Sequence, residues 1–190
     1  MKRAFDIIGA LIGLAICSPL FLVISILITY QSNGPIFFRQ IRIGYKGRPF
    51  AIFKFRTMSS IVEEEGPQLV AKCDSSNSTR LEQFLRGHHL DELPQLWNVL
   101  RGDMSFVGPR PERKYFIDKI LRHTDRYQLI YEMKPGLTSE ATLYNGYTDT
   151  MEKMLKRMEM DIHYLEHRTL WLDFTIIVKT VVNILTGKKF

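Results

Sequence analysis

The chain has 190 residues, of which 45% are hydrophobic and 24% charged, with a formal net charge of +6 and a pI of about 9.3. This length suits one modest globular domain beside a membrane segment and leaves no room for a second domain. Its two cysteines indicate neither a disulfide framework nor a metal-binding cysteine pattern. The positive charge favours partners that are nucleic acid or an anionic membrane surface with phosphorylated substrates.

The first predicted element is an apolar segment. Residues Ile7 to Tyr30 carry no formal charge, and their number is enough for a transmembrane helix of about 20 residues. Ser18 and Pro19 lie at its centre. Proline removes a backbone hydrogen bond, and a serine hydroxyl can bond back to a carbonyl and deepen the bend. We therefore expect the segment to kink or to turn back at Ser18-Pro19.

The charges around this segment favour a helix that turns back. Basic residues flank both of its ends: Lys2 and Arg3 before it, and Arg39, Arg42, Lys46 and Arg48 after it. By the positive-inside rule both sides are cytoplasmic. A re-entrant helix-break-helix over residues 1–33, followed by a cytoplasmic domain over residues 34–190, satisfies this rule. A single span kinked by proline is the alternative, and a cleaved signal peptide fits less well.

The next elements are predicted to be strands and then helices. Aromatic and basic residues alternate over residues 35–57, and Gly44 and Gly47 mark a turn, so we expect a strand pair with its second strand near Phe50 to Phe55. The polar residues 59–79 are typical of a surface loop. Helices are expected over residues 79–86, 92–100, 111–123 and 148–166. The fold class is therefore α/β and mainly helical.

The densest signal is the run from Leu90 to Asn98, which contains the adjacent acids Asp91 and Glu92. Pro94 is tolerated in a first helical turn, which predicts a helix start near Asp91. Four apolar residues then share one face, which we expect to be buried: Leu93, Leu96, Trp97 and Leu100. A carboxylate at a helix start can cap the helix, bind Mg²⁺ or act as a nucleophile, and capping is the common role of an isolated acidic pair.

The last predicted element is an amphipathic helix over residues 170–185. Its apolar stripe consists of Trp171, Phe174, Val178, Val181 and Leu185. Nearby basic residues and the two aromatic ones fit a helix that lies on a membrane surface. An apolar stripe of this kind also fits a helix that completes the core. The sequence is compatible with both.

Several motifs, taken in order, resemble those of one family. They are Lys2-Arg3-Ala4-Phe5-Asp6, Ser18-Pro19, residues 34–40 and 54–58, the Asp91-Glu92 run, residues 102–111, Pro135-Gly136-Leu137-Thr138, and Asp161 with Tyr164. In these motifs the chain resembles, almost end to end, the bacterial sugar transferases, or monotopic phosphoglycosyl transferases, which start the synthesis of lipid-linked glycans.

The resemblance implies an activity. Members move a sugar-1-phosphate from a UDP-sugar to a polyprenol phosphate such as undecaprenyl phosphate, release UMP and use Mg²⁺. It implies that Asp91 is the nucleophile that forms a phosphosugar-aspartyl intermediate. Glu92 would hold Mg²⁺ or orient Asp91, so both acids are candidate metal ligands. The expected location is the cytoplasmic face of the bacterial inner membrane, in a monotopic arrangement.

The resemblance also assigns basic and supporting residues. Lys54, Arg56, Arg86 and Arg110 match family positions near the acidic pair, and guanidinium groups suit phosphate oxygens. Asp161 matches a family acid, which would support the active site or pair with one of these arginines.

Two segments depart from the family pattern. His88 and His89 replace the Thr-Ser that often precedes the acidic motif. We interpret them as partly exposed loop residues that tune local charge, with a transition-metal site as the alternative. After Thr138 the sequence Ser139-Glu140-Ala141-Thr142 replaces the usual Gly-Trp-Ala-Gln, and Tyr147 takes the place of an arginine. This segment is expected to face the donor, so it would change how the sugar or the phosphate is bound.

Two other classes of function are considered. One is a membrane-anchored, non-catalytic adaptor of glycan assembly, and the other is a tethered nucleic-acid binder. Neither needs carboxylates between arginines, and no recognised nucleic-acid motif accompanies the charge. The expected partners are therefore a UDP-sugar, a polyprenol phosphate and membrane lipid, without nucleic acid. A homo-oligomer is compatible with the sequence.

Overall fold

The computed structural model describes residues 1–31, 34–57, 79–145, 148 and 150–186. The predicted loop at residues 59–79, apart from Thr79, and the position of Tyr147 lie outside the described residues. The helices are α1 (Lys2–Gln31), α2 (Arg80–Gly87), α3 (Gln95–Arg101), α4 (Lys114–Leu121), α5 (Glu140–Asn145), α6 (Met151–His167) and α7 (Leu170–Thr186). The strands are β1 (Phe37–Ile43), β2 (Pro49–Phe55), β3 (Ser105–Val107) and β4 (Gly136–Thr138). Short 3₁₀ segments are η1 (Tyr45–Gly47), η3 (Leu90–Glu92) and η4 (Asp125–Glu132). The mainly helical fold class is confirmed.

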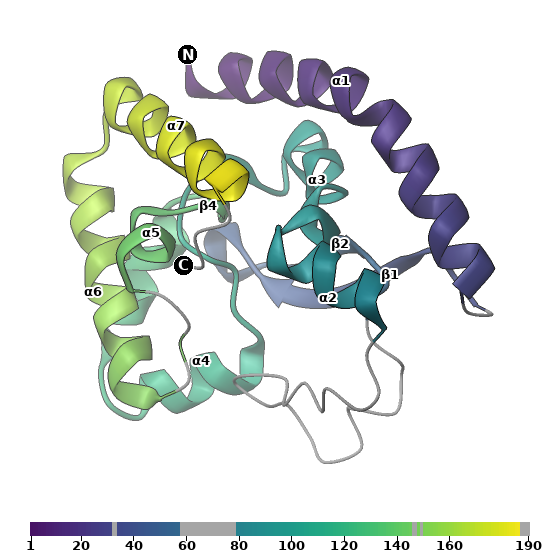
Figure 1. Cartoon of the computed structure of the whole chain (residues 1–190). Helices are drawn as coiled ribbons and strands as arrows, with labels where there is room; N and C mark the ends of the chain where they lie inside the picture. Colours follow the sequence, from purple (N-terminus) through teal and green to yellow (C-terminus); the bar gives the residue numbers. More distant parts are fainter. Residues whose placement is uncertain (32–33, 58–78, 146–147, 149, 187–190) are drawn as a thin grey trace.

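Helix α1 runs across the molecule and stays helical through Pro19, although Figure 1 shows that it bends near its middle. The segment thus bends near the predicted position without a break in the helix, and the re-entrant hairpin stays a prediction. The physical reason is local: Pro19 has no N–H for the carbonyl of Ala15, and the Ser18 Oγ donates to that oxygen instead, at 2.8 Å. Among the described residues α1 is the one helix long and apolar enough to cross a membrane.

Charged side chains fix the beginning of α1 to the rest of the fold. Lys2 Nζ donates to the carbonyl oxygen of Val107 at 3.0 Å, to Tyr164 Oη at 2.9 Å and to Asp173 Oδ2 at 2.6 Å. Tyr164 Oη in turn donates to Asp173 Oδ1. Lys2 thus connects α1 with β3, α6 and α7.

Two further residues of the first turns of α1 continue these contacts. Arg3 donates to two carbonyl oxygens of the last turn of α3, both at 2.6 Å, where the helix dipole favours a cation. Asp6 accepts from Ser105 Oγ at 2.9 Å and from the Phe106 backbone N–H at 3.1 Å. We call Lys2, Arg3, Asp6, Tyr164 and Asp173 the N-terminal network.

Strands β1 and β2 form the predicted antiparallel hairpin, with Phe37 opposite Phe55 and Ile43 opposite Pro49. The connecting turn contains Lys46 with φ of 57° and Gly47 with φ of 69°, in the left-handed region that glycine adopts most readily. The hairpin carries Arg42 and Lys54 towards the centre of the molecule.

Strands β3 and β4 pair in parallel, with Ser105 opposite Gly136 and Val107 opposite Thr138. The backbone after β3 lies very close to β4, because a Cβ atom on Gly136 would lie only 2.2 Å from the backbone nitrogen of Gly108. Only glycine permits this approach. It sets the segment after β3, which contains Arg110, beside the segment 136–138.

The predicted helix start at Asp91 is corrected. Asp91 and Glu92 belong to the 3₁₀ segment η3, Pro94 is the N-cap, and α3 begins at Gln95. The predicted buried face is also partly wrong, because Trp97 is 50% exposed. The polar residue Asn98 is buried instead: its amide donates to the Ala51 carbonyl at 2.7 Å, and its Oδ1 accepts from the Phe53 N–H at 3.1 Å. These bonds join α3 to β2.

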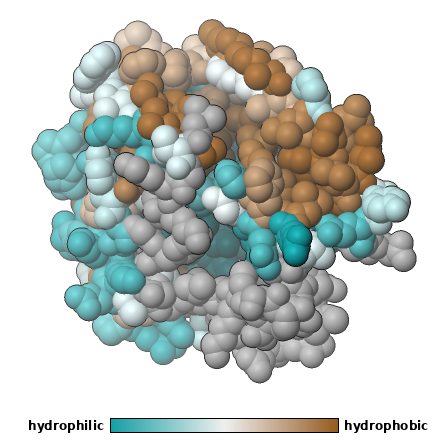
Figure 2. All heavy atoms as spheres, viewed as in Figure 1, coloured by the Kyte–Doolittle hydropathy of each residue, from teal (hydrophilic) through white to brown (hydrophobic). Residues whose placement is uncertain are grey.

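Helix α7 turns Asp173 and Ile176 towards the interior. The predicted stripe is exposed, with Trp171 at 75% and Phe174 at 50% exposure, and Val178 and Val181 are exposed as well. The side chain of Leu185 lies outside the described residues. Figure 2 shows apolar residues gathered over α1 at the top and right of the view, with more over α7. The stripe therefore does not complete the core.

Candidate functional site

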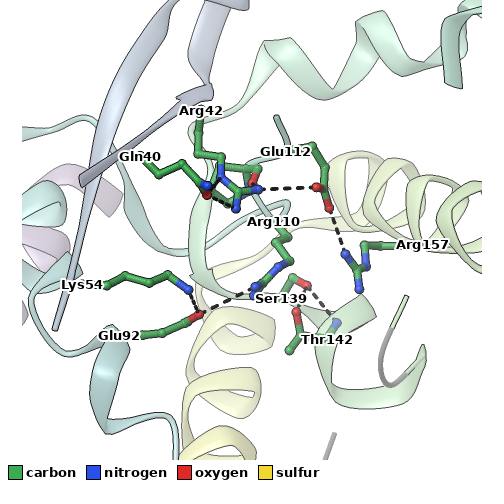
Figure 3. Close-up of polar contacts among 10 residues, drawn as sticks. Gln40, Arg42, Lys54, Glu92, Arg110, Glu112, Ser139, Thr142 and Arg157 are labelled. Carbon is green, nitrogen blue, oxygen red and sulfur yellow. Dashed lines mark hydrogen bonds and ion pairs between the residues drawn. The ribbon is translucent and has the colours of Figure 1, made fainter. Parts of the chain in front are cut away.

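Three charged side chains from three elements meet near the centre of the molecule (Figure 3). Glu92 lies in η3, Lys54 in β2, and Arg110 in the segment between β3 and α4. Lys54 Nζ lies 2.5 Å from Glu92 Oε1, and Arg110 Nη2 lies 3.6 Å from the same oxygen. The structure therefore brings together Glu92 and two of the four basic residues predicted from the sequence.

The two adjacent acids have opposite electrostatic environments. Burial alone would raise the pKa of Glu92, but the charges of Lys54 and Arg110 lower it below its usual range. Burial, followed by the charge of Glu92, raises the pKa of Asp91 to about 6. Glu92 is thus held firmly ionised, whereas Asp91 is a more basic carboxylate that still ionises near neutral pH.

Glu92, Lys54 and Arg110 border a pocket. Its other walls come from both short strand pairs and the helices beside them: Arg42, Ile52, Gln95, Pro111, Gly136, Leu137, Thr138 and Thr142. Asp91 is 7% exposed and lies beside this pocket rather than in its wall. Thr142 comes from the segment that departs from the family pattern, and Thr138 ends the matching motif before it. That this segment faces the donor stays a prediction.

A second group of charged residues adjoins Arg110 and was missed by the sequence analysis. Glu112 Oε1 lies 2.9 Å from Arg157 Nη1, and its Oε2 lies 3.6 Å from Arg42 Nη1. Arg42 also donates to Gln40 Oε1 and to the Pro111 carbonyl. The position of Glu112 directly after Pro-Arg-Pro was the one available signal. The partners lie far away in the sequence, so no spacing could have identified them.

Asp161 lies one helical turn beyond Arg157 on α6 and is 3% exposed. Together with Arg110, Glu112 and Arg157 it lines a second pocket. Within the described part of the chain, Asp161 Oδ1 and Arg157 Nε are buried without a hydrogen-bond partner. Burial raises the pKa of Asp161 to about 8, although the charge of Arg157 opposes this. Asp161 therefore lies behind Arg110, away from the pocket that Glu92 and Lys54 border.

The other two predicted phosphate-binding residues lie elsewhere. Arg56 follows β2, and its guanidinium lies against Gly34, where an added Cβ atom would come within 2.0 Å of Arg56 Nη1. Arg86 is in the last turn of α2. Neither is among the residues that line the pocket beside Glu92.

The two histidines have different surroundings. His88 Nδ1 lies 2.9 Å from the Phe84 carbonyl oxygen, and its ring packs on that of Phe84. His89 has φ of 54° and begins η3. Burial lowers its pKa, and the charges of Glu92, Arg110 and Lys54 also act on it. His89 thus belongs to the electrostatic surroundings of Glu92, and His88 turns back to its own helix.

The acidic pair fits a particular kind of metal binding. Across the described ranges no group of three or more His, Cys, Asp or Glu side chains could hold a metal ion. Mg²⁺ usually binds through one or two carboxylates together with substrate phosphates and water. Asp91 and Glu92 can supply such ligands, so the residues fit Mg²⁺ that arrives with a phosphorylated substrate.

Comparison with known proteins gives one consistent result. The family model described as bacterial sugar transferase matches residues 1–187. The chain is 39% identical over 187 residues to UDP-N-acetylgalactosamine-undecaprenyl-phosphate N-acetylgalactosaminephosphotransferase of Aeromonas hydrophila, with 98% of this chain and 44% of that protein covered. It is 41% identical to the UDP-glucose:undecaprenyl-phosphate glucose-1-phosphate transferases of Klebsiella pneumoniae, covering 95% of this chain and 39% of that protein, and of Caulobacter vibrioides, covering 97% and 70%.

The chain spans less than half the length of the Aeromonas and Klebsiella relatives. The matched region nevertheless includes the acidic pair, the hairpin that carries Lys54 and the segment that carries Arg110. The family match covers almost the entire chain, so the protein belongs to the bacterial sugar transferase family.

Proposed function

We propose that the protein is a phosphoglycosyl transferase that moves a sugar-1-phosphate from a UDP-sugar to undecaprenyl phosphate and releases UMP. The printed activities of the relatives support this reaction class. The observation that carries the proposal is the asymmetric acidic pair, in which Glu92 is ion-paired with Lys54 while the neighbouring Asp91 keeps a raised pKa. Two cations and two acids around one pocket suit a diphosphate and the charge changes of phosphoryl transfer.

In the first step an Asp91 carboxylate oxygen attacks the β-phosphorus of the UDP-sugar. The bond between that phosphorus and the bridging oxygen breaks, UMP leaves with the bonding electrons, and the sugar phosphate is held as an acyl phosphate on Asp91. In the second step an oxygen of undecaprenyl phosphate attacks the same phosphorus and releases the carboxylate. Two steps let a soluble donor and a lipid acceptor use one site in turn.

The environment of Asp91 suits this role. Its raised pKa, about 6, makes it a stronger nucleophile than an ordinary carboxylate and still leaves it ionised at pH 7 and above. Burial at 7% exposure also limits access of water, which would hydrolyse an acyl phosphate.

The neighbouring cationic side chains would bind the phosphates of the donor. Lys54 and Arg110 would move from Glu92 to the phosphate oxygens when the donor enters, because a diphosphate carries more negative charge than one carboxylate. Mg²⁺, held by Glu92 with Asp91 and the phosphates, would neutralise charge on the leaving UMP. Glu92 would thus hold Lys54 and Arg110 beside Asp91 until the donor enters, and would then be free to bind the metal ion.

The proposed setting is the cytoplasmic face of the bacterial inner membrane. Side chains exposed along α1 are large and apolar, among them Ile8, Ile16, Leu22 and Ile26. The exposed stripe of α7 offers a second apolar surface, with Trp171 at the position of an interfacial anchor. We propose that α1 enters the membrane as a bent re-entrant helix and that α7 lies on its surface. The acceptor lipid would then reach the pocket from the bilayer.

The proposal is tested by UMP release. The purified 190-residue chain in lipid nanodiscs is incubated with Mg²⁺, undecaprenyl phosphate and a panel of UDP-sugars. We expect at least one donor to yield UMP, and Asp91→Asn to abolish the release because an amide cannot form the acyl phosphate. Asp118→Asn removes a carboxylate of the exposed pair with Lys114 and should leave the rate unchanged.

Failure of every donor with folded protein would contradict the reaction and favour a non-catalytic adaptor. Equal rates for Asp91→Asn and the parent would contradict the aspartyl intermediate while leaving the reaction class in place.

A further inference from the structure

We propose that Arg157 is a positioning residue that acts through Glu112 and sets Arg110 beside Glu92. The inference rests on the proposed function in one respect, that Arg110 binds the diphosphate of the donor. It concerns Arg157 on α6, and Arg157 itself is not one of the family motif residues considered above.

The segment that carries Arg110 needs support from outside. Residues 109–113 belong to no helix or strand, and the prolines at 109 and 111 have no backbone N–H to donate. Gly136 donates to the Pro109 carbonyl at 2.9 Å, Ile43 donates to the Glu112 carbonyl at 3.1 Å, and Arg42 Nη1 reaches the Pro111 carbonyl at 3.1 Å. At the far end, the first turn of α4 donates two backbone bonds to the Arg113 carbonyl. A side-chain attachment adds to these bonds.

Glu112 provides that attachment. It stands between Arg42 on β1 and Arg157 on α6, and the three side chains are only 12–14% exposed. The bond to Arg157, at 2.9 Å, is shorter than the 3.6 Å contact with Arg42. Removing one member of a buried ion group leaves an uncompensated charge. Loss of Arg157 would therefore release Glu112 towards β1 and shift the backbone that precedes it.

The charges alternate along this path (Figure 3). Lys54 and Arg110 flank Glu92, and Arg42 and Arg157 flank Glu112. The positive charge of Arg110 acts on Arg157 and, with burial, lowers the pKa of Arg157, while Glu112 opposes this. Glu112 is thus the counter-charge that lets three guanidinium groups lie close together. Arg110 lies 3.6 Å from Glu92, beyond a normal hydrogen bond, so Glu92 alone does not fix it.

The test is a double-mutant cycle on UDP binding, measured by calorimetry with the full chain in nanodiscs and Mg²⁺. We expect Arg110→Gln and Arg157→Met each to weaken UDP binding on the order of tenfold. The double variant should bind no more weakly than Arg110→Gln, because Arg157 acts through Arg110. Arg157→Lys keeps the charge and should recover part of the loss. Arg126→Met breaks the exposed pair with Glu159, also on α6, and is the matched control with unchanged binding.

The inference would be overturned if the losses of UDP binding free energy from the two substitutions added up in the double variant. Parent-like UDP binding by Arg157→Met would also overturn it. If Arg157→Met does not fold, Glu112→Gln removes the same ion pair and replaces it in the cycle. UMP release separates the two proposals. If UMP is released and the losses of UDP binding are additive, only the positioning role is rejected. If the losses of UDP binding are coupled but no UMP is released, only the transferase activity is rejected. Parent protein that binds no UDP rejects both.

Discussion

The N-terminal network and the charged group beside Arg110, which consists of Arg42, Glu112, Arg157 and Asp161, both contain buried charges. They differ in how completely the buried polar atoms are hydrogen-bonded. Lys2 has three acceptors and Asp6 has two donors. Within the described residues, the only buried side-chain atoms without a partner are Thr148 Oγ1, Arg157 Nε and Asp161 Oδ1. None of them belongs to the N-terminal network. Two of them line the pocket behind Arg110.

The difference is between a fully paired charge network and a partly paired one, and we propose that the second serves the chemistry. A fully paired network rigidifies the fold, because each buried charge has lost water and gained a specific partner. A partly paired network costs stability and keeps polar groups available. The first holds α1 against the rest of the domain, and the second adjoins the pocket. A substitution in the N-terminal network should therefore lower stability more than activity. A substitution beside the pocket should lower activity more than stability.

The largest expected effect is on activity, from Lys54→Met. It removes the 2.5 Å partner of Glu92 and one proposed contact with the donor phosphates, and loss of one such group typically costs about 10²–10³ in rate. The free energy of unfolding should fall by less than the loss of rate corresponds to, because Arg110 still faces Glu92. UMP release and thermal unfolding are measured on the same sample. Lys114→Met, at an exposed pair, is the control.

A loss of stability in Lys54→Met that matched its loss of rate would contradict the distinction between the two networks. A parent-like rate would remove Lys54 from the donor site.

The comparison also shows what sequence could reveal. Helices α2, α6 and α7 and the β1–β2 hairpin follow from period and turn residues, and they lie where predicted within a few residues. Strands β3 and β4 have three residues each, too few to show a period. The helix through Pro19 depends on one hydroxyl that replaces a missing donor, and Asn98 is buried because it bonds to another strand. Such tertiary partners override local preference.

The same limit applies to the site. Glu92, Lys54 and Arg110 were identified by motif and do meet in space. Arg42, Glu112 and Arg157 were not, because their contacts join residues that are 45 or more positions apart. Arg56 and Arg86 have the right chemistry near the motif, but neither lines this pocket, and their role stays a prediction.

The second prediction addresses the N-terminal network. Asp6→Ala leaves the Ser105 hydroxyl and the Phe106 N–H without their acceptor, and an unsatisfied buried donor costs about 1–3 kcal/mol. The unfolding temperature in nanodiscs should fall, while UMP release per folded molecule stays near that of the parent. Asp125→Ala, an exposed acid, should leave both unchanged. A selective loss of activity in Asp6→Ala would show that this network also serves catalysis.

The third prediction concerns the pH dependence of stability, to which Asp161 should contribute. Its folded-state pKa is raised to about 8 by burial, with Arg157 opposing and Glu112 and Glu140 adding to the rise, whereas an unfolded aspartate has a pKa of about 3.9. Between these values the folded protein holds a proton that the unfolded chain does not. The free energy of unfolding must therefore fall as the pH rises from about 4 to 8.

Asp161→Asn should remove this part of the slope and make the protein more stable than the parent at pH 8, because the amide carries no charge to be ionised. Denaturant unfolding at a series of pH values measures it, with Asp118→Asn, at an exposed pair, as the control. A slope identical to the parent's would mean that Asp161 is ionised and paired in the folded protein. The buried groups behind Arg110 would then resemble the fully paired N-terminal network.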